Sequence, residues 1–186
     1  MPLFALDKEL VFPPVNLAEP DGLLAVGGDL STDRLLLAYK SGIFPWYEKE
    51  HILWWCPDPR FVLFPHELKV SKSMTQLFRK NIFQFSINKD FATVINNCKT
   101  ISRRGQDGTW ITEEVKKAYI KLHELGIAHS AEAWLNGELV GGLYGLRIFD
   151  QVVDLRRSHA HCIHRSIVTC STGIENDDIG SPNHNA

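Results

Sequence analysis

Apolar residues recur at helical spacing in four segments of the chain, and this pattern predicts four amphipathic helices. The clearest begins after Thr112, a favourable N-cap, carries Glu113 and Glu114 in its first turn, and ends at Gly126. Its apolar stripe consists of Val115, Ala118, Tyr119, Leu122 and Leu125. The other three helices are predicted over residues 31–42, over residues 71–80, and from a cap at Asn88 or Asp90 through Cys98.

Alternation of apolar and polar positions predicts strands between these helices. Phe83–Ile87 has the pattern of a half-buried strand, and Phe61–Phe64 is predicted as a short strand. His129–Leu135 and Glu138–Ile148 are joined by Asn-Gly, the strongest short signal of a β-hairpin. Strands that alternate with helices in this way predict a sheet with helices on it, an α+β fold.

The character of the sequence changes twice along the chain, which predicts three parts. Residues 1–60 are rich in Pro and Gly, residues 61–148 carry the strands and helices of the predicted sheet, and residues 149–186 differ from both. All five tryptophans and all eleven lysines precede Phe149, whereas four of the eight histidines follow it. The polar end of the chain, from Thr172 onward, is predicted to be disordered.

Composition restricts the class of partner. The 186 residues carry a formal net charge of -2, so a polyanionic partner would require a local basic patch. No stretch approaches the roughly 18 apolar residues that span a bilayer, and the first residues lack the basic stretch and apolar run of a signal peptide, so no membrane partner is expected. Cys56 and Cys98 lie singly in apolar surroundings, as reduced thiols do, and the expected compartment is the cytoplasm.

Two aromatic features are candidate binding sites. Ile43–Trp46 and Leu53–Arg60 together hold three of the five tryptophans, bounded by prolines. Such a cluster is either a small aromatic core, or an apolar pocket or stacking surface for a base. Trp110 precedes a predicted helix, where it either anchors the helix entry or lines a cleft.

Several further motifs each allow a structural and a functional interpretation. Arg79-Lys80 and Arg103-Arg104 are basic pairs, either solvated surface or a phosphate-binding face. Gly141-Gly142 inside a predicted strand indicates a bulge, which serves either packing or a ligand cleft. His159–His164 has the residue types of a zinc site but lacks a second cluster, so chance composition is the preferred interpretation. No Ser/His/Asp set or carboxylate pair presents itself as a catalytic unit.

Six motifs in order resemble those of one family. They are Glu19–Leu30, Gly42–Trp46, Leu53–Arg60, Gly108–Thr112, Tyr119–Ser130 and Glu138–Gly145. On these residues the chain resembles the leucyl/phenylalanyl-tRNA–protein transferase family over about residues 12–148. The resemblance implies a small N-terminal domain followed by a larger GNAT (acyltransferase-like) domain.

The resemblance also implies an activity and the residues that serve it. The family transfers Leu or Phe from Leu-tRNA or Phe-tRNA to acceptor proteins with an N-terminal Arg or Lys, which marks them for degradation. This chemistry needs no metal or cofactor, and a monomer is expected. Carried over by position, Trp46, Trp110 and Leu143 line the cleft for the amino-acid side chain and terminal adenosine, and Arg79 and Lys80 belong to the tRNA-binding face.

The sequence departs from the family after Ile148. The family continues with a Gly-Glu-Ser motif and an Asp-x-Gln type motif, whose acidic and amide groups polarise the attacking amine, and neither can be matched here. No catalytic residue is therefore identified, and residues 149–186 are expected to be a poorly ordered, non-family tail produced by a frameshift or truncation. The alternative to an enzyme is a non-catalytic fragment that binds aminoacyl-tRNA.

Overall fold

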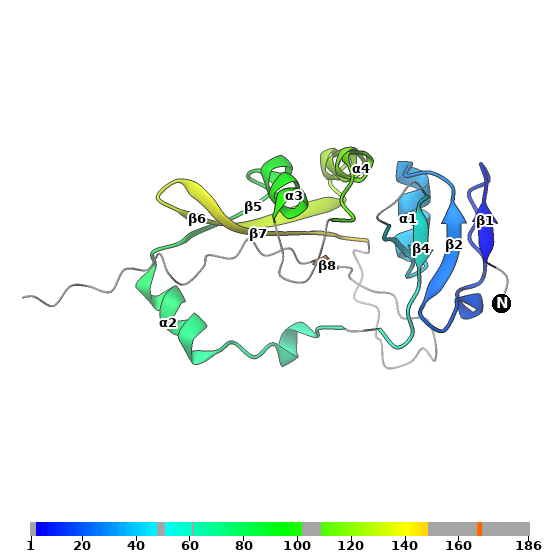
Figure 1. The fold of residues 1–186 in the computed structure, drawn as a ribbon. Coiled ribbons are helices and arrows are strands. Elements are labelled where there is room, and N and C mark those ends of the chain that lie inside the picture. The colour runs from blue at the N-terminus through cyan, green and yellow to red at the C-terminus, as the bar shows by residue number, and fades with distance from the viewer. Residues whose placement is uncertain (1–2, 48–50, 61, 102–108, 149–166, 169–186) are drawn as a thin grey trace, which may run out of the picture.

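The computed structural model describes residues 3–47, 51–60, 62–101, 109–148 and 167–168. These residues form two four-stranded sheets with helices, so the α+β class predicted from the sequence is confirmed. Figure 1 shows the first sheet at one end of the molecule and the second, longer sheet beside it, with α3 and α4 lying on one of its faces. None of the helices among the described residues is long and apolar enough to cross a membrane.

The first sheet has the order β1-β2-β4-β3, with β1 parallel to β2 and the other pairs antiparallel. Its strands are Phe4–Leu6 (β1), Leu23–Gly27 (β2), Phe44–Pro45 (β3) and Leu53–Trp55 (β4), and a 3-10 turn covers Val15–Leu17. Helix α1, Thr32–Lys40, begins at Ser31, whose hydroxyl accepts a hydrogen bond from the backbone N–H of Arg34. Burial of Leu35 and Tyr39 fixes this helix against the sheet.

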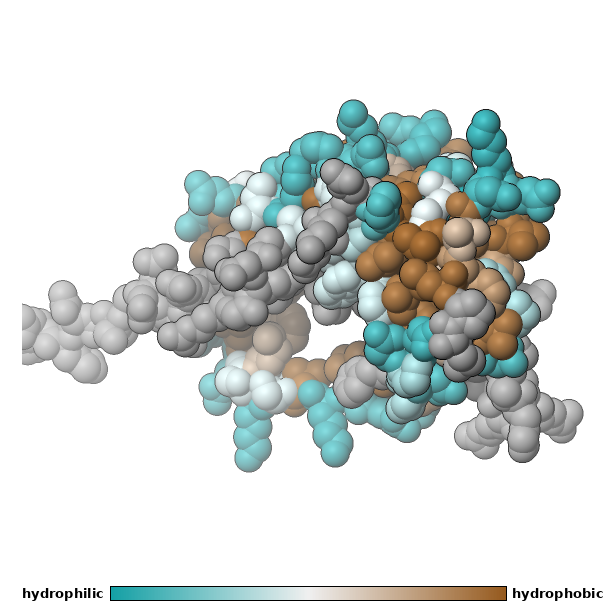
Figure 2. Space-filling view, turned by 45° about the vertical axis from the view of Figure 1, so that its right-hand side comes forward, coloured by the Kyte–Doolittle hydropathy of each residue, from teal (hydrophilic) through white to brown (hydrophobic). Residues whose placement is uncertain are grey.

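The connection to the second sheet contains a 3-10 turn, Pro65–Glu67, and helix α2, Lys72–Lys80. The prediction of a strand over Phe61–Phe64 is wrong for the described residues 62–64, which have no regular structure. Pro65 ends the apolar run at once, and no neighbouring strand in the described part of the chain pairs with it. Figure 2 shows an opening between the segment that carries α2 and the body of the molecule.

The second sheet has the order β5-β6-β7-β8 and is antiparallel throughout. Its strands are Gln84–Ile87 (β5), Ala128–Leu135 (β6), Glu138–Leu146 (β7) and Ile167–Val168 (β8). The predicted hairpin is confirmed, since Asn136 and Gly137 both take positive φ angles, 52° and 86°, as a tight turn between β6 and β7 requires.

Helices α3, Phe91–Thr100, and α4, Glu113–Glu124, are capped as the sequence predicts. The side chains of Asp90 and Thr112 accept the capping bonds from Thr93 and Val115, at 3.0 and 3.2 Å. The core between these helices and the sheet consists of Phe91, Val94, Ile95, Cys98, Val115, Tyr119, Leu122, Ala128, Tyr144 and Leu146.

The bulge predicted near Gly141-Gly142 lies one step earlier, where the register between β6 and β7 shifts at Ala133/Trp134. Gly142 serves packing. A Cβ atom at Gly142 would lie 3.0 Å from the Cγ2 atom of Val94, so the absence of a side chain lets α3 approach the sheet.

The opposite face of the second sheet carries apolar side chains that the described residues cover only in part, through the contact of Phe78 on α2 with Phe85 at 5.4 Å between ring centroids. The prediction that Phe83–Ile87 is half-buried is wrong for its apolar face, since Phe85 is 61% and Ile87 67% exposed. Helices α3 and α4 cover the face of the sheet to which β5 contributes Ser86. The outer edge of β7 is paired at Tyr144 and Gly145, by the two residues of β8; the rest of the 149–186 tail lies outside the described residues.

Candidate functional site

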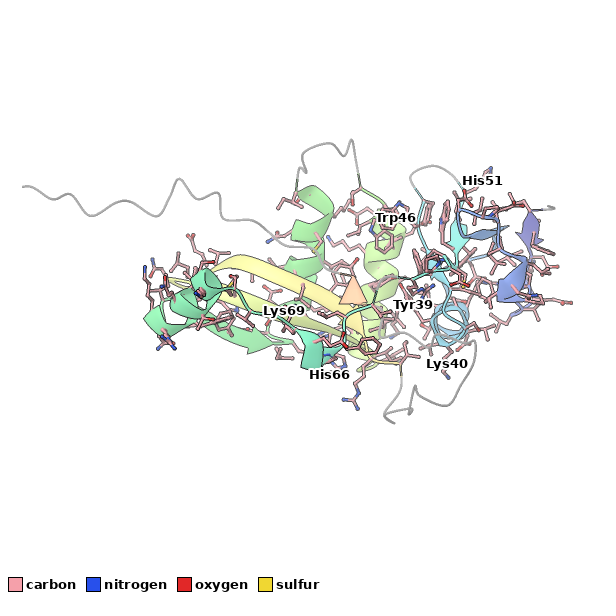
Figure 3. All side chains as sticks on the ribbon, turned by 90° about the horizontal axis from the view of Figure 1, so that it is seen from below. Tyr39, Lys40, Trp46, His51, His66 and Lys69 are labelled. Atoms are coloured by element: carbon pink, nitrogen blue, oxygen red, sulfur yellow. The ribbon has the colours of Figure 1, made fainter. Side chains whose placement is uncertain are left out.

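Two of the predicted site residues, Trp46 and Trp110, meet where the N-terminal part and the second sheet adjoin. Their rings are stacked, with centroids 5.8 Å apart and an interplanar angle of 16°. Trp46 is 44% exposed and Trp110 only 4% exposed, so one ring faces solvent and the other supports it. Figure 3 shows Trp46 and Tyr39 at this junction, between the N-terminal strands and α4.

Hydrogen bonds hold the backbone of Trp46, and Trp110 is held by its place at the start of α4 and by an aromatic contact. The backbone N–H of Trp46 donates to the carbonyl of Leu53 at 2.9 Å, and the indole N–H of Trp55 donates to the carbonyl of Trp46 at 2.8 Å. Trp110 lies just before the N-cap of α4 and contacts Tyr119 edge-on at 6.1 Å between centroids. Trp110 therefore anchors the helix entry, one of the two roles that the sequence left open, and its ring stacks on Trp46.

A buried tyrosine pair lies behind the tryptophans. The hydroxyls of Tyr39 on α1 and Tyr119 on α4 share a hydrogen bond, and Tyr119 also contacts Tyr144 edge-on at 5.7 Å. Burial raises the pKa of Tyr39 and of Tyr119, so both hydroxyls stay protonated at neutral pH. This hydrogen bond joins α1 to α4, and Tyr119 in turn contacts Trp110.

An open hollow of roughly 280 Å³ lies beside Trp46, lined by Asp21, Phe44, Trp46, Trp55 and Pro57. Gly22 allows the backbone beside Asp21 to lie close to Pro57, because a Cβ atom at Gly22 would lie 2.7 Å from the Cα of Pro57. The backbone N–H of Cys56 donates to the Gly22 carbonyl at 2.7 Å and holds this approach. Burial raises the pKa of the nearby Cys56 thiol, so this group is not an activated nucleophile.

The third predicted lining residue, Leu143, is not brought to the tryptophan pair. It lies on β7 opposite Ala131, on the face away from the helices, and is 38% exposed. A second, apolar hollow of roughly 250 Å³ lies toward the far end of this sheet, lined by Met74, Leu77, Phe78, Phe83, Phe85, Ala133, Val140 and Gly141.

The arginines and lysines considered for phosphate binding, together with Arg60 of the aromatic cluster, divide into three groups. Arg79 and Lys80 are exposed in the last turn of α2, and no ion pair within the described ranges engages them. Figure 1 shows α2 at the far end of the second sheet from the tryptophan junction. Arg60 instead donates to the Gly42 carbonyl and lies over Phe44, so it serves packing. Arg103-Arg104 and the His159–His164 cluster lie outside the described residues.

Glu132 is a buried group that the sequence interpretation missed. It is 2% exposed on β6 and accepts hydrogen bonds from the hydroxyls of Ser86 and Ser130, both at 2.6 Å, and from the backbone N–H of Lys89 at 3.2 Å. Burial alone would raise the pKa of Glu132, but these bonds together lower it. Its position in the inward-facing alternation of β6 was the signal available in the sequence.

The fold and the described side chains define an α+β protein with two sheets, a stacked tryptophan pair where the two sheets adjoin, and an open aromatic hollow beside Trp46. A family profile described as "Leucyl/phenylalanyl-tRNA protein transferase" matches residues 62–153, and one described as its N-terminal domain matches residues 28–58. The chain belongs to the leucyl/phenylalanyl-tRNA–protein transferase family.

Individual relatives agree with these profiles. A leucyl/phenylalanyl-tRNA–protein transferase of Syntrophobacter fumaroxidans is 59% identical over 149 residues, which are 80% of this chain and 64% of the relative. Those of Syntrophus aciditrophicus and Christiangramia forsetii are 59% and 52% identical, over 80% and 81% of this chain and 62% and 72% of their own lengths. The chain thus spans less than two thirds of the first two relatives.

Proposed function

We propose that this chain serves the transfer of Leu or Phe from aminoacyl-tRNA to the α-amino group of acceptor proteins that begin with Arg or Lys. The observation that carries the proposal is the stacked pair Trp46–Trp110 at the junction of the two parts. The proposal places the chain in the cytoplasm as a monomer and takes the second sheet as the start of a GNAT-like domain.

The tryptophan pair would hold the terminal adenosine of the donor. Stacking of a base on an aromatic side chain contributes about 1–3 kcal/mol and tolerates any base, which suits an adenine common to every tRNA end. With centroids 5.8 Å apart, the rings must separate slightly to admit a base between them, and the exposed Trp46 is the ring free to move. Leu143 is left out of the proposed donor site, because it lies on the face of β7 away from the helices.

The body of the tRNA would contact α2. Arg79 and Lys80 are exposed and lie far from the tryptophan pair, so one small ligand cannot reach both sites. A tRNA is large enough to place its end in the cleft and its phosphates against α2. Lysine and arginine bind phosphates through charge and release counterions, which makes such binding sensitive to salt.

The reaction is attack of the acceptor amine on the ester carbonyl of the donor. A peptide bond forms, the ester bond breaks, and the proton lost by the amine is balanced by the proton gained at the tRNA hydroxyl. The enzyme must therefore position both substrates, accept a proton and stabilise the oxyanion. Trp46 and Trp110 contribute positioning alone, because neither ring can take up a proton at neutral pH.

The test is transfer of labelled Leu from Leu-tRNA to a peptide that begins with Arg, catalysed by the purified 186-residue chain. Transfer that is lost in Trp46→Ala supports the proposal. Transfer that is unaffected by Trp46→Ala contradicts the assignment of the cleft.

A second candidate function is binding of aminoacyl-tRNA without catalysis. It is favoured because, among the described residues, the walls of the cleft contain aromatic rings and one carboxylate but no acid–base pair. In the same assay this candidate predicts saturable binding of Leu-tRNA that protects its ester, with no label in the peptide.

A further inference from the structure

Tyr47 follows Trp46 directly in the chain, and it is buried where Trp46 is open to solvent. Tyr47 is 4% exposed and Trp46 is 44% exposed. Consecutive residues of an extended chain direct their side chains to opposite sides, so the burial of Tyr47 turns Trp46 outward. A buried tyrosine places its hydroxyl against a hydrogen-bond partner. The partner of Tyr47 therefore bears on the exposed ring of the proposed donor site.

This partner is Thr112, on the other side of the junction between the first sheet and α4. The hydroxyl groups of Tyr47 and Thr112 are hydrogen-bonded at 3.3 Å. Thr112 is also the N-cap of α4, and its Oγ1 atom accepts a bond from the backbone N–H of Val115 at 3.2 Å. A hydroxyl oxygen can accept two hydrogen bonds, so the cap and the contact with Tyr47 are compatible. Burial raises the pKa of Tyr47, so its hydroxyl keeps its proton at neutral pH.

Both ends of this hydrogen bond lie next to the stacked tryptophans. On one side, Tyr47 is bonded through the chain to Trp46. On the other side, the backbone N–H of Thr112 donates to the carbonyl of Trp110 at 3.0 Å. The Tyr47–Thr112 bond therefore holds the backbone on both sides of the stack, while the side chain of Trp46 stays free to rotate.

We infer that Tyr47 is a positioning residue, whose hydroxyl bond to Thr112 sets the spacing of the two stacked rings. Its effect on the donor rests on the proposed function, in which the terminal base enters between these rings. A site that is already held in its binding geometry loses less of the interaction energy to ordering. Without the bond, the donor has to order Trp46 as it binds, and its affinity falls.

The test removes one hydroxyl at a time from the full chain. Tyr47→Phe keeps the buried ring and removes the bond. Thr112→Gly removes the same bond from the other side, and glycine at an N-cap costs little stability. Thr112→Ser is the conservative variant, because it keeps a hydroxyl for both contacts. Ser130→Ala is the matched control, because it removes a buried hydroxyl whose bond, to Glu132 at 2.6 Å, stays within the second sheet.

The first measurement is the circular dichroism that arises from coupling between two stacked indole rings. The part due to the stack is the difference between each protein and the same protein carrying Trp46→Phe. Tyr47→Phe and Thr112→Gly should each reduce this ring signal, and the double variant should reduce it no further, because both changes remove one bond. Thr112→Ser and Ser130→Ala should retain the signal.

The second measurement is equilibrium binding of a non-hydrolysable leucyl-adenosine amide, an analogue of the donor end. Tyr47→Phe should bind it about fivefold more weakly than wild-type protein, the factor that corresponds to one neutral hydrogen bond. Ser130→Ala should bind it as wild-type protein does. Urea unfolding of Tyr47→Phe and Ser130→Ala compares their stability, and a merely structural role of Tyr47 predicts the same binding for both.

An unchanged ring signal or unchanged donor binding in Tyr47→Phe, equal losses in Ser130→Ala, or additive losses in the double variant would each overturn the inference. Failure of the proposed function gives a different result. If wild-type protein does not bind the amide, the proposed function is contradicted, and the ring signal alone decides whether Tyr47 positions Trp46.

Discussion

The two sheets of this molecule differ in how completely they are covered. The first sheet and α1 enclose the fully buried side chains of Trp54, Leu24 and Leu35, which belong to one continuous core with the side chains under α3 and α4. The second sheet buries one face under α3 and α4, while Phe85 and Ile87 on the other face stay more than 60% exposed. The stacked tryptophans lie where the first sheet meets α4, so the candidate donor site is supported by well-packed elements.

The largest expected effect comes from removing a core ring of the first sheet. Trp54 is fully buried, contacts Phe12 edge-on at 4.9 Å and donates its indole N–H to the Gly27 carbonyl at 2.9 Å. Trp54→Ala should lower the free energy of unfolding by about 3–5 kcal/mol, and Phe85→Ala by less than about 1 kcal/mol. Urea unfolding monitored by circular dichroism measures both, and equal losses would remove the contrast between the sheets.

The next effect concerns the buried carboxylate of the second sheet. Glu132→Gln weakens the four hydrogen bonds that the carboxylate accepts and should cost about 1–3 kcal/mol, whereas Glu138→Gln at the exposed start of β7 should cost almost nothing. The lowered pKa of Glu132 means that its stabilisation is complete above the ordinary carboxyl pKa of about 4.3 and is lost as pH falls through the lowered value. Unfolding measured between neutral and acidic pH should therefore show a weaker acid dependence in Glu132→Gln.

A smaller effect is expected on tRNA binding. Replacing Arg79 and Lys80 together by Ala should weaken binding by about 1–2 kcal/mol at low salt and reduce the salt slope by about 1–2, as expected for one phosphate contact each. Lys40→Ala, in the last turn of α1, is the control and should change neither quantity. Filter binding over a range of salt concentrations measures this, and an unchanged slope in the double variant would refute the assignment of α2.

The smallest effect on stability is expected on the face of the second sheet away from α3 and α4. Substitutions there should instead change solubility. Phe85→Ser with Ile87→Ser should change the free energy of unfolding by less than about 1 kcal/mol and reduce self-association, because exposed apolar patches promote it. Light scattering at matched concentrations measures the change. Unaltered scattering would mean that this face is not the source of association.

Local sequence signals were sufficient to predict the helices and the hairpin, but not to predict which face of each strand is buried. The caps at Ser31, Asp90 and Thr112 and the Asn-Gly turn act within a few residues, so the sequence predicted the helices and the hairpin correctly. Alternation in β5 indicated a strand, but which face is covered depends on helices placed by distant contacts.

For the candidate site, too, the sequence indicated the individual residues but not their arrangement in space. The tryptophan motifs singled out Trp46 and Trp110, but their stacking depends on a junction between segments 64 residues apart, which includes the Tyr39–Tyr119 contact. Asp21 escaped notice because its turn motif is ordinary, and only pairing of β2 with β4 brings it beside Trp55 and Pro57.

The most direct test of the account is equilibrium binding of the leucyl-adenosine amide to wild-type protein, Trp46→Phe and Trp46→Ala, followed by tryptophan fluorescence or calorimetry. Because Trp46 is 44% exposed, its replacement leaves the core intact. The account predicts saturable binding to wild-type protein, slightly weaker binding to Trp46→Phe, and a loss of about 1–3 kcal/mol in Trp46→Ala, as removal of a stacking ring requires. Equal binding to all three proteins, or no binding to any of them, would contradict the claim that the tryptophan junction is the donor site.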